Sequence, residues 1–109
     1  MNYSVYTIPP FDKQLKRLVK KYPSLKEEFS EILDELTMLP ETGTHIGNSV
    51  YKIRISISSK GKGKSGGARI ITYVQIQQSS VYLLTIYDKS EKEDVSKEEL
   101  NKMIQNIID

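Results

Sequence analysis

Three basic side chains on predicted strands could stabilise the charge of a phosphate group. Apolar and polar side chains alternate over residues 51–57, which predicts a strand with one core face and one basic face. Lys52 and Arg54 lie on the basic face, and Arg69 opens the next predicted strand. Antiparallel pairing would put the three cations together opposite the core, where arginine can stabilise a charged transition state. The alternative is that they are ordinary solvated strand residues.

The basic side chains lie in a segment without any acidic residue. Between Glu41 and Asp88 the sequence has no aspartate or glutamate, but it has several cations: Lys52, Arg54, Lys60, Lys62, Lys64 and Arg69. A cluster without counter-ions favours a polyanionic ligand. Three of its lysines alternate with glycines, which permit close approach to a phosphate backbone, so Lys60, Lys62 and Lys64 are predicted RNA-binding residues. The simpler alternative is a solvated loop that lysines keep soluble.

The same loop contains two nucleotide-binding patterns that its context rules out. Gly61, Gly63 and Gly66 match G-x-G-x-x-G, with Asp88 downstream, but that fingerprint needs a helix after the loop, whereas a strand is predicted here. Gly63-Lys64-Ser65 resembles the end of a P-loop, but Ser58 stands where its first glycine belongs. We therefore expect neither dinucleotide binding nor nucleotide hydrolysis.

Other kinds of catalytic site have little support in the composition. The chain has no cysteine, which excludes a catalytic thiol, a disulfide framework and a thiolate metal site. His45 is the only histidine and lies in a predicted loop, so it is not assigned to the site. The acidic residues of the second predicted helix have no histidine beside them and are interpreted as a solvated face. No metal site is predicted.

The 109 residues are enough for one compact domain, residues 1–109, and too few for two. The N-terminus has no basic region followed by an apolar run, and no stretch approaches the roughly 18 apolar residues of a membrane span. We therefore expect a cytoplasmic protein without a membrane partner.

The order of elements predicts an α+β fold. A strand over residues 3–8 precedes two amphipathic helices, which Pro23 separates and Pro40 ends, and Ser24 with Glu27 forms a capping-box pattern. Residues 41–49 read as a loop, and three strands follow as an antiparallel meander over 51–57, 69–76 and 81–87. A second capping box at Ser96 and Glu99 begins a C-terminal helix. The expected fold is an N-terminal strand and a helical hairpin packed on an antiparallel sheet with a C-terminal helix.

These elements, together with three sequence segments, resemble the RelE/ParE toxin superfamily, especially its HigB-like branch. The segments are Tyr51-Lys52-Ile53-Arg54, the Gly-Lys loop that leads to Gly67-Ala68-Arg69-Ile70-Ile71, and Leu83 to Glu91. The likeness spans nearly the whole chain, and the loop is its most specific part. The resemblance implies a RelE-like fold and a toxin of a type II toxin-antitoxin module.

The resemblance also implies an activity and its residues. The expected activity is metal-independent, ribosome-dependent cleavage of messenger RNA, in which the 2′-hydroxyl attacks the scissile phosphate and leaves a 2′,3′-cyclic phosphate. No cofactor is needed. The family's basic pair matches Lys52 and Arg54, its arginine at the start of the next strand matches Arg69, and its lysine after the last strand matches Lys89. Residues 88–96 lack the histidine or late tyrosine of some relatives, which leaves Tyr87 or a lysine for proton transfer.

The implied partners are the ribosome, messenger RNA and a cognate antitoxin of the helix-turn-helix class. We expect an acidic antitoxin segment to lie along the sheet near the predicted cations and the C-terminal helix. Two alternatives stay open: a ParE-like toxin that binds DNA gyrase without cutting RNA, and a degenerate relative that only binds partners. The fold alone does not distinguish them.

Overall fold

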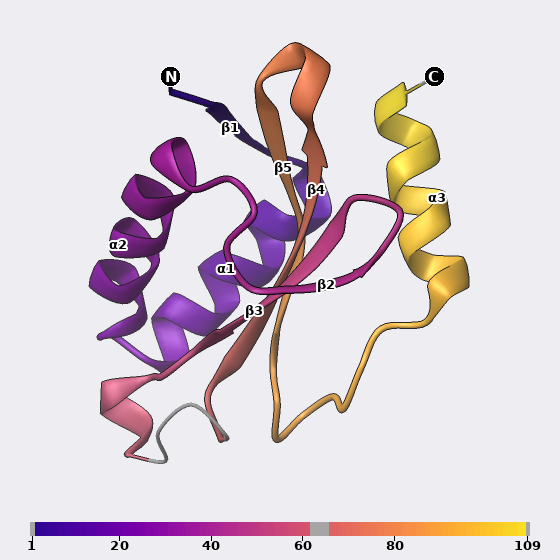
Figure 1. Cartoon of the computed structure of the whole chain (residues 1–109). Coiled ribbons are helices and arrows are strands. Elements are labelled where there is room, and N and C mark those ends of the chain that lie inside the picture. Colours follow the sequence, from indigo (N-terminus) through magenta and orange to yellow (C-terminus); the bar gives the residue numbers. More distant parts are fainter. Residues whose placement is uncertain (1, 62–65, 109) are drawn as a thin grey trace.

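The computed structural model describes residues 2–61 and 66–108 (Figure 1). Its helices are α1 (Pro9–Lys21), α2 (Leu25–Met38) and α3 (Lys97–Ile108). Its strands are β1 (Ser4–Thr7), β2 (Thr44–Gly47), β3 (Val50–Ile55), β4 (Ala68–Gln75) and β5 (Ser80–Asp88). Short 3₁₀ turns, η1 (Ser58–Lys60) and η3 (Ile76–Gln78), follow β3 and β4. The α+β class and the predicted order of helices and major strands are confirmed.

The first two helices begin and end for reasons that the sequence contains. Helix α1 begins at Pro9 and Pro10, which have no backbone N–H and therefore leave no amide without an acceptor in the first turn. The helix ends at Lys21, two residues before Pro23. The predicted capping box at Ser24 and Glu27 is wrong, because Ser24 itself has helical dihedral angles and makes no side-chain cap. Its hydroxyl instead donates to Glu28 and contacts the hydroxyl of Ser59, so the serine ties α2 to η1.

The described strands form one five-stranded sheet in the order β1-β5-β4-β3-β2. The predicted antiparallel meander of β3, β4 and β5 is confirmed, while β1 joins the edge of β5 in parallel, so the whole sheet is mixed. The prediction of a loop over residues 41–49 is partly wrong, because Thr44–Gly47 pairs antiparallel with β3. A turn through Asn48 and Ser49, both with positive φ, connects these two strands.

The two faces of the sheet carry different amounts of core. Helices α1 and α2 cover one face, and α3 lies on the other (Figure 1). The face under α1 and α2 holds the larger cluster, built from residues such as Phe11, Leu18, Leu36 and Ile70. The α3 face holds a smaller cluster that includes Val50, Ile71, Leu84, Tyr87, Val95 and Leu100. The predicted apolar stripe of α3 is therefore confirmed at Leu100, Met103, Ile104 and Ile107, whereas the Ile108 side chain lies outside the described residues.

A β-bulge in β5 decides which face Tyr87 occupies. Thr72 pairs with Leu83 and Ile71 pairs with Thr85, so Leu84 is one extra residue on β5. Such an insertion reverses the alternation of side chains beyond it. Val81 and Leu83 consequently belong to the α1–α2 core, whereas Tyr87 belongs to the α3 side. Gln14 of α1 supports the irregular segment, because its carbonyl oxygen accepts hydrogen bonds from the Thr85 hydroxyl and the Ile86 amide.

Candidate nucleic-acid interface

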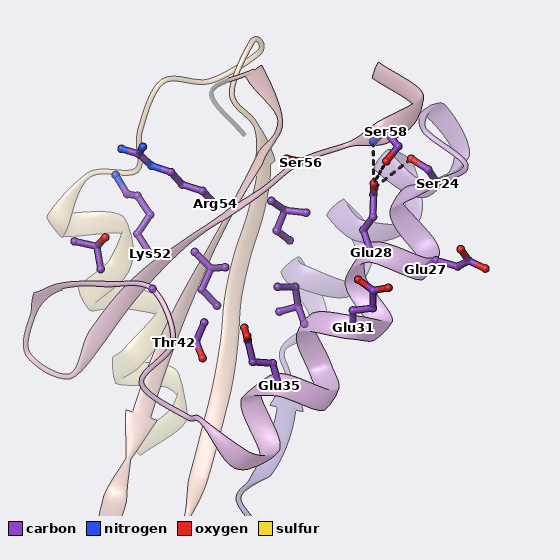
Figure 2. Close-up of a pocket in the computed structure, with 15 residues that line it drawn as sticks. Ser24, Glu27, Glu28, Glu31, Glu35, Thr42, Lys52, Arg54, Ser56 and Ser58 are labelled. Carbon is purple, nitrogen blue, oxygen red and sulfur yellow. Dashed lines mark hydrogen bonds between the residues drawn. The ribbon is translucent and has the colours of Figure 1, made fainter. Parts of the chain in front are cut away.

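Three predicted site residues form a row across adjacent strands on the α3 side of the sheet. Arg54 of β3 is directly opposite Arg69 of β4, and Arg69 is directly opposite Tyr87 of β5. Lys52 precedes Arg54 by two residues and so lies on the same face, next to Ile71. In Figure 2 the side chains of Lys52 and Arg54 extend to the same side of β3. We call Lys52, Arg54, Arg69 and Tyr87 the cationic face.

The members of the cationic face differ in how far they are exposed. The Arg54 side chain reaches solvent, whereas Arg69 is only 5% exposed and donates to the Ala68 carbonyl at 3.1 Å. Arg69 is therefore held in place on the sheet, whereas Arg54 extends into solvent from the neighbouring strand.

The Tyr87 hydroxyl on this face is suited to donating a proton. Burial, together with the nearby Asp94 carboxylate, raises the pKa of Tyr87 to about 12, although the Arg69 charge acts in the opposite direction. The phenol therefore stays protonated at neutral pH and donates a long hydrogen bond of 3.5 Å to Asp94. The sequence leaves Tyr87 or a lysine for proton transfer, and a phenol that stays protonated can act only as the acid.

Asp94 is a site-adjacent residue that the sequence reasoning missed. Its Oδ1 accepts a hydrogen bond from the Lys52 ammonium at 3.0 Å and another from the Val95 amide at 2.8 Å. The hydrogen bond from Lys52 lowers the pKa of Asp94 below its usual range. Asp94 follows a run of alternating acidic and basic residues, and only the tertiary fold brings it back to β3, 42 residues away in sequence.

Lys89 lies beside the cationic face but points elsewhere. Its backbone amide donates to the Gly67 carbonyl at 3.0 Å, which joins the end of β5 to the start of β4. Its ammonium donates to the Glu93 carbonyl at 3.2 Å. The structure therefore brings Lys52, Arg54, Arg69 and Tyr87 together, while the Lys89 side chain stabilises the segment that leads to Asp94.

The Lys60 side chain, which the sequence predicts to bind RNA, lies in a network of hydrogen bonds inside the protein. Its side chain is 8% exposed and forms an ion pair with Asp88, whose side chain is fully buried. Its ammonium also donates to the Ser90 hydroxyl at 2.8 Å and lies 5.5 Å from the centre of the Tyr22 ring. In this arrangement the Lys60 ammonium is paired with a buried carboxylate and does not extend into solvent. Lys62 and Lys64, the other two predicted RNA-binding residues, lie outside the described residues.

Asp88 is the centre of this buried network. It accepts hydrogen bonds from the Tyr22 hydroxyl at 2.7 Å and from the Ser90 amide and hydroxyl at 2.9 and 2.7 Å, besides the Lys60 ammonium. Burial acts to raise the pKa of Asp88, but the hydrogen bonds from Lys60, Ser90 and Tyr22 outweigh it and hold the pKa well below its usual range. The network fastens α1, η1 and the end of β5 to one another.

A groove of about 870 Å³ lies between α2 and β3 (Figure 2). Lys52 and Arg54 border it on the strand side, while Glu27, Glu31 and Glu35 border it on the helix side. These glutamates are exposed, in agreement with the prediction of a solvated acidic face. A polyanion would be repelled by that wall. Within the described residues, the cationic face is therefore a better candidate than the groove for an anionic ligand.

Three further structural observations concern metal binding, His45 and membrane spans. In the described part of the chain, no three histidine, cysteine or acidic side chains are grouped closely enough to hold a metal ion. His45 lies on β2 with its ring 5.0 Å from that of Tyr51, outside the cationic face. No helix within residues 2–61 and 66–108 is both long and apolar enough to cross a membrane.

Comparison with known structures gives the same fold. A double mutant of the Escherichia coli toxin RelE in the free state superposes with a TM-score of 0.64 at 15% identity, covering 98% of this chain and 99% of that one. The RelE–RelB complex of Pyrococcus horikoshii gives a TM-score of 0.57 at 18% identity, covering 84% and 100%. The E. coli mutant bound to an antitoxin RelB peptide gives 0.52 at 16%, covering 94% of each chain.

The sequence itself matches a protein-family model over most of its length. Residues 11–107 match the model described as the RelE toxin of the RelE/RelB toxin-antitoxin system. The matched segment begins in α1 and ends in α3, so it includes the whole cationic face. The chain belongs to the RelE toxin family of type II toxin-antitoxin systems.

Proposed function

We propose that this toxin is a metal-independent endoribonuclease that cleaves messenger RNA on the ribosome and thereby inhibits translation. The observation that carries the proposal is the row of Arg54, Arg69 and Tyr87 across three strands, with Lys52 beside it. It combines two cations with a neutral proton donor on a rigid sheet, which favours chemistry at a phosphate over simple attachment to it.

Each residue of the cationic face has a role in the proposed reaction. The RNA 2′-hydroxyl gives its proton to a water molecule as its oxygen bonds to the adjacent phosphorus and closes the cyclic phosphate. Arg54 and Arg69 stabilise the added negative charge at phosphorus. The bond to the 5′-oxygen then breaks, and the Tyr87 hydroxyl supplies the proton for that leaving oxygen. Lys52 binds a phosphate oxygen beside the row. Lys89 acts indirectly, by holding the segment that precedes Asp94.

The proposed partners follow from the same surface. The ribosome would present the messenger RNA in the cytoplasm, and a cognate antitoxin of the helix-turn-helix class would silence the toxin. Solved relatives in complex with RelB support the antitoxin as a class of partner. An acidic antitoxin segment lying over the cationic face and α3 would exclude RNA. The HigB-like branch within the family is proposed from the Gly-Lys loop.

Cleavage on purified ribosomes tests the proposed function. Ribosomes carrying a defined messenger RNA are mixed with the toxin, and the new ends are mapped by primer extension. We expect cuts that require the ribosome, persist with excess chelator and carry 2′,3′-cyclic phosphate and 5′-hydroxyl termini. Intact messenger RNA and unimpaired translation at saturating toxin would overturn the proposal. DNA damage signalling with intact messenger RNA in cells would indicate a gyrase-directed toxin instead.

A further inference from the structure

The Asp94 carboxylate lies where the cationic face would receive an anion. One oxygen, Oδ1, accepts hydrogen bonds from the Lys52 ammonium at 3.0 Å, the Val95 amide at 2.8 Å and the Tyr87 hydroxyl at 3.5 Å. Two of these donors, Lys52 and Tyr87, belong to the cationic face. A non-bridging phosphate oxygen takes the same donors as a carboxylate oxygen. The position of Oδ1 is therefore chemically equivalent to a phosphate subsite.

The carboxylate is easier to displace than the groups that hold it. Lys52 extends from a strand with only 24% of its side chain exposed, and Tyr87 is buried on the neighbouring part of the sheet. The Asp94 side chain is 66% exposed and belongs to the link between β5 and α3. Ion pairs with so exposed a partner contribute little to stability. The Lys52 and Tyr87 donors are thus held in place by the sheet. The Asp94 carboxylate that accepts their hydrogen bonds is held only by the link between β5 and α3.

We propose that Asp94 is an internal competitor that occupies a phosphate-binding position in the free toxin and that RNA must displace. The identification of the ligand as RNA rests on the proposed function, whereas phosphate binding at this position does not. When the phosphate enters, Lys52, Tyr87 and the Val95 amide exchange the carboxylate for the phosphate oxygen, and the Asp94 side chain rotates away into solvent.

The competition makes the site selective for polyanions. Asp94 is tethered, so its effective concentration at the donors is high and a small anion competes poorly with it. A polynucleotide brings a second phosphate that Arg54 can contact at the same time, and this added attraction offsets the cost of moving Asp94. The device would keep the cationic face from binding the small phosphate compounds of the cell.

Titration with inorganic phosphate tests the inference without any RNA cleavage. Amide NMR signals of the full chain are followed while phosphate is added at constant ionic strength. Asp94→Asn keeps the shape of the side chain and removes its charge, so phosphate affinity should rise about fivefold. Glu93→Gln makes the same charge change one residue earlier, at an exposed side chain, and should leave the affinity unchanged. In the unaltered protein, the Val95 amide signal should move as phosphate displaces Asp94.

The outcomes separate this inference from the proposed function. An equal gain in both variants would show an effect of net charge alone and overturn the inference, as would a loss of phosphate affinity in Asp94→Asn. If Asp94→Asn does not fold, the unaltered protein still tests the inference. A Val95 amide signal that does not shift when phosphate is added to the unaltered protein would overturn the inference. A selective gain in Asp94→Asn without any messenger RNA cleavage by the unaltered toxin would contradict the proposed function and leave the Asp94 competitor supported.

Discussion

Two lysines of the same acid-free segment each pair with an aspartate, yet the two pairs differ in almost every other respect. Lys60 and Asp88 are 8% and 0% exposed, and the aspartate has further hydrogen bonds from Tyr22 and Ser90. Lys52 and Asp94 are 24% and 66% exposed. The first pair is enclosed where α1, η1 and β5 meet, whereas the second lies at the open end of the cationic face.

The comparison shows that pairing with an enclosed carboxylate, and not charge alone, separates the structural cation Lys60 from Lys52, whose carboxylate partner is exposed. Breaking a buried pair leaves an uncompensated charge in a poorly hydrated place, which is costly. An exposed pair exchanges its partner for water or a ligand at little cost. We therefore assign stability to Lys60 and Asp88, and ligand binding to Lys52, and the following predictions test that division.

The largest effect on stability is expected from Asp88→Asn. The substitution leaves the Lys60 ammonium buried without an anion and should lower the free energy of unfolding by about 3 kcal/mol. Chemical denaturation at neutral pH measures it. Glu91→Gln is the matched control, because Glu91 pairs with Arg17 and Lys21 at the surface. Equal destabilisation by both substitutions would refute the special role of the buried pair.

The pH dependence of the free energy of unfolding should reflect the same Lys60–Asp88 pair. The pKa of Asp88 is depressed in the folded state. The contribution of the Asp88 carboxylate to the free energy of unfolding is therefore complete above the unfolded carboxyl pKa of about 4. That contribution is lost as the pH falls from there toward the folded-state pKa. The stability difference between the unaltered protein and Asp88→Asn should be constant from about pH 5 to 7 and shrink below about pH 4. A difference that grows on acidification would contradict this sign.

Weakening the packing of α3 should affect the exposed Lys52–Asp94 pair and not the buried Lys60–Asp88 pair. Leu100 is buried in the smaller core beside Val95, and its replacement by alanine should cost about 2 kcal/mol by leaving a cavity. Because α3 anchors the link that carries Asp94, hydrogen exchange at the Val95 amide should accelerate while exchange at the Ser90 amide of the buried network stays slow. Asn101→Ala, at an exposed helix position, should change neither. Faster exchange at both amides would show that the pairs are not independent.

The smallest effect on stability is expected from Lys52→Ala. Its partner is largely exposed, so unfolding free energy should fall by less than about 1 kcal/mol. Ribosome-dependent cleavage should fall clearly despite the intact fold. Thermal unfolding and cleavage assays on the same preparation separate the two quantities. A variant as unstable as Asp88→Asn would place Lys52 with the structural cations.

Local sequence patterns predicted most of the fold and only part of the site. The periodic apolar residues identified α1, α2, α3 and the meander, because each pattern is set within one element. Strand β2 was missed because Gly43 and Gly47 resemble a loop, although Gly43 is needed where a side chain would lie 2.5 Å from the Lys52 carbonyl. The parallel pairing of β1 with β5 joins opposite ends of the chain and leaves no local pattern.

The site residues divide in the same way. Lys52, Arg54 and Arg69 were placed correctly on one face because strand alternation and antiparallel pairing suffice to do so. The assignment of Tyr87 to that face depends on the extra residue Leu84, which alternation does not predict. The Lys60–Asp88 and Lys52–Asp94 pairs depend on tertiary contacts across 28 and 42 residues. The charge run alone therefore could not distinguish a buried lysine from an accessible one.

Single-turnover cleavage of ribosome-bound messenger RNA by Arg69→Ala and Lys60→Met tests the central claim most directly. Both variants are assayed at saturating toxin and at a temperature where each is folded, so that neither binding nor stability limits the rate. We predict that Arg69→Ala lowers the rate by about 10²-fold or more, because the proposed reaction uses Arg69 to stabilise charge at the reacting phosphorus. Lys60→Met should stay within about threefold of the unaltered toxin. Cleavage that survives in Arg69→Ala and is lost in folded Lys60→Met would contradict the assignment of the cationic face as the reactive surface.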